Sequence, residues 1–304
     1  MSPLPFIQPT VNDRGDVVFT GIVETEHGIH IPGETYIGLG AGLYQANHGG
    51  SMVDVVIPGD PAPGRGTFDF LAEGWVNAGG DISFEGHVAG EDTEIDGFPP
   101  QDQLISALTS LYLKRAGTGE VISIVHAGDP APGGGAFRQV FHDVMNDRGD
   151  IAFIGDLTPP PRSNQTFGVF LYTHGDVLAI ARPGDPLPGG GVLLNPSIVG
   201  GNDHVNNEGD VVFSAQVDVG DGSLVTGLYQ WSNGALSVVA RTGTVIPGVG
   251  TIDQLASPQM VVPPPPVLSP TSGAINNNRG QVVFQATLTD GRGVMLLATP
   301  QGNG

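Results

Sequence analysis

Short segments with a period-two pattern of apolar residues run along the chain, and each follows the same polar phrase. In its first copy, residues 12–19, the phrase reads Asn-Asp-Arg-Gly-Asp-Val-Val-Phe. Five copies begin 60 to 71 residues apart, at Asn12, Asn77, Asn146, Asn206 and Asn277. A period of two is typical of β-strands. Because the phrase returns at nearly even spacing, the sequence predicts a repeat architecture.

The Asn-x-x-Gly part of the phrase predicts a tight turn that leads into a strand, since Asn and Gly tolerate left-handed backbone angles. Each strand carries an aromatic residue with a small residue two positions later. The pairs are Phe19/Gly21, Phe84/Gly86, Phe153/Gly155, Phe213/Ala215 and Phe284/Ala286. A large residue beside a small one on the same face suggests stacked sheets, with a ring filling the space above the small neighbour.

Three further strands and a loop complete each repeat. A second strand contains Gly-Leu-Tyr or a variant, at residues 42–45, 110–113, 169–172, 227–230 and 293–296. A third strand follows a short turn, and a fourth leads back to the next Asn-x-x-Gly turn. Between these two lies a Gly-Asp-Pro-x-Pro-Gly loop, degraded at residues 243–248. We expect its aspartates, Asp60, Asp129 and Asp185, to cap backbone amides.

Four strands in each repeat of about 65 residues are typical of a β-propeller blade. The sequence therefore predicts one all-β domain over residues 1–304, a five-bladed β-propeller. The blades are expected at about 1–58, 59–127, 128–183, 184–242 and 243–304. The last repeat ends on its third strand, so we expect a blade one strand short unless residues 1–5 fill the place. An unfilled edge would be open to pairing with other chains.

Composition narrows the class of partner. The formal net charge is -20, which disfavours nucleic acid and anionic lipid, and we expect neither. No cysteine is present, which excludes disulfides and thiolate chemistry. No apolar stretch approaches about 18 residues, so no membrane span is expected. The chain begins almost directly on the first repeat, so we expect signal and anchor segments to be absent from it.

The phrases Asn-Asp-x-Gly-Asp-Val-x-Phe, Gly-Leu-Tyr and Gly-Asp-Pro-x-Pro-Gly resemble those of a group of bacterial exported tandem-repeat proteins, often anchored at the cell surface. The resemblance covers nearly the whole chain, but the shared motifs are turns and strands. It implies a propeller-like fold and a secreted or cell-surface location. It implies no catalytic residue.

Connectors of very different length are expected on one face of the propeller, and function usually lies on such loops. Polar residues reach this face at strand ends: Glu24, Glu85, His87, Asp156, Gln216 and Asp218. His87 and Asp156 occupy equivalent positions in adjacent repeats and form a candidate acid/base pair, with Glu85 and Glu24 as further catalytic candidates. The alternative is a solvated acidic rim. Gln216 and Asp218 are candidate ligand-binding residues.

Two clusters have metal-like spacing. His27 and His30, with Glu24 and Glu26, form a weak zinc pattern and are also candidate ligand-binding residues. Asp92, Glu94 and Asp96 have the alternate spacing of a calcium loop. Gln103 stands where an EF-hand has its bidentate glutamate, so a looser site is expected. Calcium is the one cofactor that the sequence suggests.

Two functions remain open. The first is an exported binding or self-assembly module for an extracellular ligand, a glycan or a protein, acting through the loop face or the open edge. The alternative is a carbohydrate-active enzyme, a hydrolase or lyase, that uses loop-face carboxylates and His87. Only Trp75 and Trp231 could supply tryptophan platforms for sugars, which favours the first function.

Overall fold

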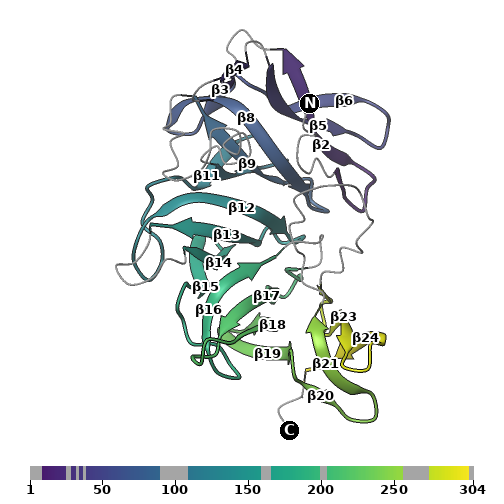
Figure 1. The fold of residues 1–304 in the computed structure, drawn as a ribbon. Coiled ribbons are helices and arrows are strands. Elements are labelled where there is room, and N and C mark those ends of the chain that lie inside the picture. The colour runs from purple at the N-terminus through teal and green to yellow at the C-terminus, as the bar shows by residue number, and fades with distance from the viewer. Residues whose placement is uncertain are drawn as a thin grey trace. The chain divides into compact units, whose positions relative to one another are not determined.

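A computed structural model describes residues 9–24, 29–31, 34–36, 39–89, 109–158, 166–198, 204–255 and 274–300 of the chain. The fold is all-β, as predicted, with curled antiparallel sheets and no helix in these residues (Figure 1). Consequently, none of the described segments is a helix that could cross a membrane. The chain divides into two compact units, Met1–Gly149 and Asp150–Gly304. The single-domain organisation stays a prediction.

The first unit contains two antiparallel groups of strands, here called the first and second repeat sheets. The first consists of β1 (Thr10–Val11), β2 (Val17–Glu24), β5 (Leu39–Ala46) and β6 (Met52–Val56). The second consists of β8 (Arg65–Val76), β9 (Ile82–Val88), β10 (Ser110–Lys114) and β11 (Val121–Val125). A parallel pairing of Ala41 with Phe70 joins the two groups.

Shorter elements accompany these sheets. Strand β7 (Pro61–Ala62) pairs with β8, and β3 (Ile29–Ile31) pairs with β4 (Glu34–Tyr36). The third repeat begins with β12 (Phe137–Met145), which packs against β8, β9 and β10 of the first unit.

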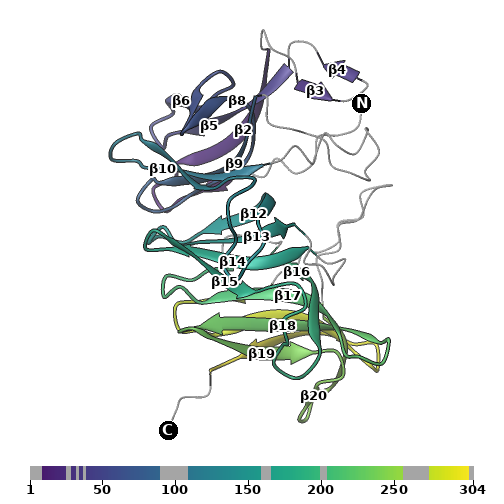
Figure 2. The same cartoon turned by 90° about the vertical axis from the view of Figure 1, so that its left-hand side faces the viewer.

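The second unit also consists of antiparallel sheets (Figure 2). Strands β13 (Ile151–Leu157), β14 (Phe167–Thr173) and β15 (Asp176–Ala181) pair in order. The fourth repeat sheet consists of β16 (Val192–Ser197), β17 (Val211–Asp218), β18 (Leu224–Ser232) and β19 (Ala235–Arg241). The fifth consists of β20 (Val245–Ile246), β21 (Gly250–Leu255), β22 (Ile275–Asn276), β23 (Val282–Leu288) and β24 (Gly293–Ala298).

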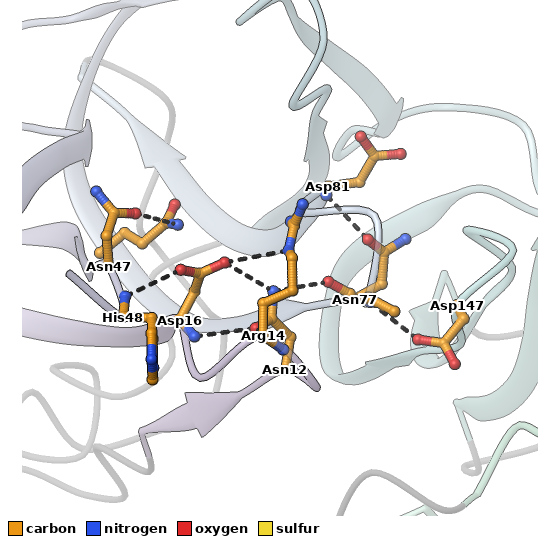
Figure 3. Close-up of polar contacts among 10 residues, drawn as sticks. Asn12, Arg14, Asp16, Asn47, His48, Asn77, Asp81 and Asp147 are labelled. Atoms are coloured by element: carbon orange, nitrogen blue, oxygen red, sulfur yellow. Dashed lines mark hydrogen bonds and ion pairs between the residues drawn. The ribbon is translucent and has the colours of Figure 1, made fainter.

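The Asn-x-x-Gly turns link neighbouring repeats (Figure 3). The Asn12 side-chain oxygen accepts hydrogen bonds from the backbone amides of Arg14 and Asp16, both at 3.0 Å. Its Nδ2 donates to the carbonyl of Asn77, in the next repeat, at 3.1 Å. Asn206 donates to the carbonyl of Asn277 in the same way, at 2.8 Å. The predicted turns are confirmed, and their polar side chains are structural.

The Gly-Asp-Pro-x-Pro-Gly loops also have the predicted capping role. Asp60, Asp129 and Asp185 each accept a hydrogen bond from the backbone amide three residues earlier, at 3.0, 2.8 and 2.8 Å. Thr244 does the same in the degraded copy, where its hydroxyl accepts from the amide of Arg241 at 3.0 Å. A threonine replaces the aspartate in this copy, so a short side chain with one hydrogen-bond acceptor is enough to cap the backbone amide.

Cross-strand pairing fixes the register of each sheet. The motif phenylalanine lies opposite Tyr44, Tyr112, Phe170, Tyr229 or Leu296 in the five copies. In the third and fifth copies this register differs by one residue from the predicted alignment of the Gly-Leu-Tyr strands. The small motif residue makes room for the partner ring within its own sheet. A Cβ on Gly21 would come within 2.9 Å of the Tyr44 ring.

The sheets stack in one direction. We call the face with the motif phenylalanine the aromatic face, and the other the reverse face. On the first repeat sheet, the reverse-face residues Val18 and Leu43 pack with Phe84 and Tyr112 of the second sheet's aromatic face. Val212 on the fourth sheet packs with aromatic-face residues of the fifth in the same manner. In both cases an aromatic face covers the reverse face of the preceding sheet.

Candidate functional site

Three of the candidate catalytic residues are buried. Glu85 and His87 lie on the reverse face of β9, and Asp156 lies in β13. A solvated rim therefore does not describe these three positions. His87 belongs to the first unit and Asp156 to the second. Their pairing as acid and base stays a prediction.

The other candidates are less well defined. Gln216 is exposed and accepts a hydrogen bond from Asn195 at 3.2 Å, while Asp218 accepts one from the amide of Gly220 at 2.7 Å. Glu24 ends β2 and His30 lies in β3, but their side chains are not described. His27, Asp92, Glu94 and Asp96 lie outside the described residues. The ligand-binding and calcium assignments stay predictions.

Within the part of the chain that the structure describes, no three His, Asp or Glu side chains are arranged to hold a metal ion. The strongest polar feature lies between the reverse face of the second repeat sheet and β12. Ser83 Oγ donates a hydrogen bond to Asp143 Oδ2 at 2.5 Å, and both side chains are buried. We call Asp69, Glu73, Trp75, Ser83, Glu85, His87 and Asp143 the polar layer.

The repeat itself shows how unusual this layer is. Ser83 occupies the position of Val18, Ala152 and Val212 in other copies, and those three residues are fully buried and apolar. A buried polar group in place of a valine costs stability unless it is hydrogen-bonded. The second repeat therefore departs from the structural pattern at this position, and such departures are expected at functional sites.

Several groups in the polar layer lack a hydrogen-bond partner among the described residues. His87 Nδ1 lies 2.6 Å from Asp69 Oδ1, but its buried Nε2 has no partner. Trp75 Nε1 and Asp143 Oδ1 are likewise buried and unpartnered. Unsatisfied buried groups are rare, and each calls for a structural or functional reason.

Two carboxyls of the layer are protonated more readily than usual. Burial raises the pKa of Asp143 to about 7; the hydrogen bond from Ser83 opposes this shift, and the nearby Glu73 carboxylate adds to it. Burial also raises the pKa of Glu73 to about 7. Two neighbouring carboxyls with such values exchange protons near neutral pH, which general acid/base chemistry requires.

The sequence does not single out Asp69, Glu73 and Asp143 as site residues, because all three lie in strands to which it assigns only a structural role. The one local indication in the sequence is Ser83, a hydroxyl residue at a position where other copies have valine or alanine. Its hydroxyl donates a hydrogen bond to the buried carboxyl of Asp143 in β12.

These features define an all-β protein with curled sheets that pack through apolar faces and with a buried polar layer beside β12. Residues 6–299 match the model of a family described as "Family of unknown function (DUF7453)", and the chain belongs to that family. No curated protein matches the chain.

Several solved structures are similar over most of the chain. A gluconolactonase from Xanthomonas campestris has a TM-score of 0.39 at 12% identity, over 97% of this chain and 76% of that one. TolB from Acinetobacter baumannii has a TM-score of 0.38 at 11% identity, and the match covers 97% of this chain and 55% of TolB. Trypanosoma rangeli sialidase has a TM-score of 0.36 at 10% identity, and the match covers 85% of this chain and 39% of the sialidase. The chain thus spans about half of TolB and well under half of the sialidase. At such TM-scores the likeness says nothing about activity.

Proposed function

We propose that this protein is an exported five-bladed β-propeller module that acts by binding an extracellular glycan, a protein or its own copies, and not by catalysis. The observation that carries this proposal is the outer edge of the fifth repeat sheet. There β24 pairs with β23 alone among the described strands. The equivalent strands β5, β10, β14 and β18 each have a second neighbour.

An open strand edge presents unpaired backbone groups to solvent, and proteins normally cover or disrupt such an edge. On β24 the apolar side chains of Met295 and Leu297 are exposed. A row of backbone donors and acceptors beside apolar side chains suits strand addition or protein docking. The net charge of -20 disfavours acidic partners, its own copies included, at low salt, and salt screens this repulsion.

A glycan array combined with a polysaccharide-degradation screen tests this function. We expect binding to a glycan or protein without release of cleaved product. Glu73→Gln and Asp143→Asn should leave that binding unchanged, because Asp143 is buried, Glu73 is half-buried, and neither belongs to β24. Degradation by the wild type that either substitution abolishes would overturn the proposal.

The second candidate is the carbohydrate-active enzyme, and the polar layer favours it. Burial raises the pKa of Glu73 and of Asp143 to about 7, and His87 Nδ1 lies 2.6 Å from Asp69 Oδ1. These are the groups that proton transfer at a glycosidic bond requires. This candidate predicts that Asp143→Asn abolishes turnover, whereas Asp221→Asn, at an exposed turn, leaves it intact.

A further inference from the structure

One pair of repeat positions packs each sheet against the strand that begins the next repeat. The first member follows a turn asparagine in the motif strand, and the second precedes the next turn asparagine. In the first copy the pair is Val18 and Gly74, and a Cβ on Gly74 would lie 3.1 Å from Val18 Cγ1. In the fourth copy it is Val212 and Ala274, which belong to one apolar core cluster. Neither pair contains a polar side chain.

The second copy replaces both members of this pair with polar residues. Ser83 stands in place of a valine, and Asp143 stands in place of a glycine or an alanine. Both side chains are buried, and the serine donates its hydrogen bond to the aspartate. The third pair is Ala152 and Asp203, of which Asp203 lies outside the described residues. A double replacement that forms a new buried contact indicates a specific role for this interface.

Two further hydrogen bonds join β12 to the second repeat sheet. The backbone amide of Val140 donates to the carbonyl of Thr109 at 3.0 Å, and the Thr109 hydroxyl donates to the carbonyl of Val140 at 2.5 Å. Thr109 directly precedes β10, and both residues belong to the first unit, as do Ser83 and Asp143. We call these two hydrogen bonds, together with that between Ser83 and Asp143, the β12 seam.

The surroundings of the β12 seam are mostly acidic. The titratable side chains of the second repeat sheet that face β12 come from β8 and β9: Asp69, Glu73, Glu85 and His87. Strand β10 places the apolar Leu111 and Leu113 on this face. Strand β12 itself also carries Arg138 and His142. A second negative charge beside Asp143 is therefore unfavourable, and a proton on Asp143 relieves it.

The protonation state of Asp143 depends on whether the β12 seam is closed. In the closed seam burial raises its pKa to about 7; the hydrogen bond from Ser83 opposes this shift, and the Glu73 carboxylate adds to it. In an open seam, with the side chain in water, the pKa returns toward 3.8. The closed seam is therefore most stable below about pH 4, and it loses stability as the pH rises to about 7.

We infer that the β12 seam is a proton-controlled switch, in which a proton on Asp143 holds β12 against the second repeat sheet and its loss loosens this contact. The loosened seam admits water to Trp75 and His87, whose Nε1 and Nε2 atoms are buried without a partner among the described residues. This inference does not depend on the proposed function, because binding at β24 involves none of these residues.

Hydrogen exchange of the Val140 amide, followed by NMR, measures opening of the β12 seam, because this amide donates across it. Its protection factor should fall at least about tenfold between pH 5 and pH 8. At pH 8 it should also be lower than those of the most protected amides of β5, in the same unit. Equal protection of Val140 and β5 would mean that the whole unit unfolds at once, which would overturn the switch.

Two variants test whether the polar pair controls the seam. Ser83→Val/Asp143→Ala installs the apolar pair of the fourth copy, and Asp143→Asn removes only the charge. Both should reduce the fall in Val140 protection to less than about threefold, the remainder arising from the half-buried Glu73. Asp221→Asn makes the same carboxyl-to-amide change at an exposed turn and should keep the wild-type fall. A full fall in Asp143→Asn would overturn the assignment to this pair, even if the double variant does not fold.

Quenching of Trp75 fluorescence by acrylamide, in a Trp231→Phe background, provides a second measurement. Trp75 is only 8% exposed, so quenching should be weak at pH 5 and stronger at pH 8. In Asp143→Asn it should stay weak at both values. Quenching and Val140 protection that do not change with pH in the wild type would overturn the inference. The glycan and protein screens would still decide the proposed function, because their readout is ligand binding.

Discussion

The two faces of the second repeat sheet are built differently although the same strands form both. The aromatic face buries Phe68, Phe84 and Tyr112, whose rings lie 4.9 to 5.9 Å apart. The reverse face buries Ser83, Glu85 and His87 against β12. The aromatic face repeats what the other copies have. On the reverse face, Ser83 replaces a residue that is buried and apolar in three other copies, and the polar side chains of Glu85 and His87 are buried beside it.

This difference distinguishes the aromatic residues, which stabilise the fold, from the residues of the polar layer, which do not. Aromatic pairs at equivalent positions stabilise each sheet through buried area and ring contacts. A polar layer with unsatisfied atoms adds nothing comparable to stability. The aromatic face should therefore tolerate substitution poorly, whereas substitutions in the polar layer should have small or even favourable effects on stability.

The largest effect is expected from Phe84→Ala on the aromatic face. Phe84 is fully buried, and its loss leaves a cavity beside Phe68 and Tyr112. The first unit should lose about 3–5 kcal/mol of unfolding free energy. Urea unfolding, followed by Trp75 fluorescence in a Trp231→Phe background, measures this loss.

Phe19→Ala is the matched control, because Phe19 occupies the same repeat position but is only half-buried. Its cost should be clearly smaller, about 1–2 kcal/mol. Equal losses in the two variants would show that burial does not distinguish the copies.

An intermediate effect is expected from Asp143→Asn in the polar layer. The pKa of Asp143 is raised from 3.8 to about 7, so the folded state holds a proton that the unfolded state releases. Stability must then fall as pH rises from about 4 to about 7, and stay low above that range. The asparagine removes the buried charge, so at pH 8 the variant should be more stable than the wild type by about 2–4 kcal/mol.

Urea unfolding at a series of pH values measures this dependence, and Ser83→Ala provides a second reading. Ser83 stabilises the charged carboxylate through its hydrogen bond, so its removal should raise the pKa of Asp143 further. The lower plateau of stability would then be reached at a higher pH. A wild type whose stability is flat between pH 4 and 7 would contradict the assigned protonation of the layer.

Much of the aromatic face could be predicted from the sequence, because repetition made each copy a check on the others. The period-two pattern predicts the strands that carry Phe19, Phe84 and Phe213, and the recurring turn glycines, which have positive φ in every copy, predict where these strands begin. The capping role of Asp129 followed from its position between two prolines. These features depend on local sequence, which a single chain displays.

The polar layer could not be predicted in the same way. Asp143 and Ser83 are 60 residues apart, and nothing local to either indicates that they share a hydrogen bond. A position at a strand end predicts that His87 lies near solvent, but burial depends on what packs above the strand. Nothing in the sequence indicates that the side chain of His87 contacts that of Asp69, which lies in the neighbouring strand β8.

The smallest effect tests whether a polar group placed inside an aromatic face contributes to stability. Tyr112 and Tyr229 occupy the same repeat position and are both fully buried. The hydroxyl of Tyr112 lies 3.1 Å from His126 Nε2, whereas that of Tyr229 has no partner among the described residues. Tyr112→Phe should cost about 1 kcal/mol, and Tyr229→Phe should be neutral or slightly stabilising. Thermal unfolding of the two variants beside the wild type measures both changes, and a larger loss for Tyr229→Phe would show that its hydroxyl is satisfied after all.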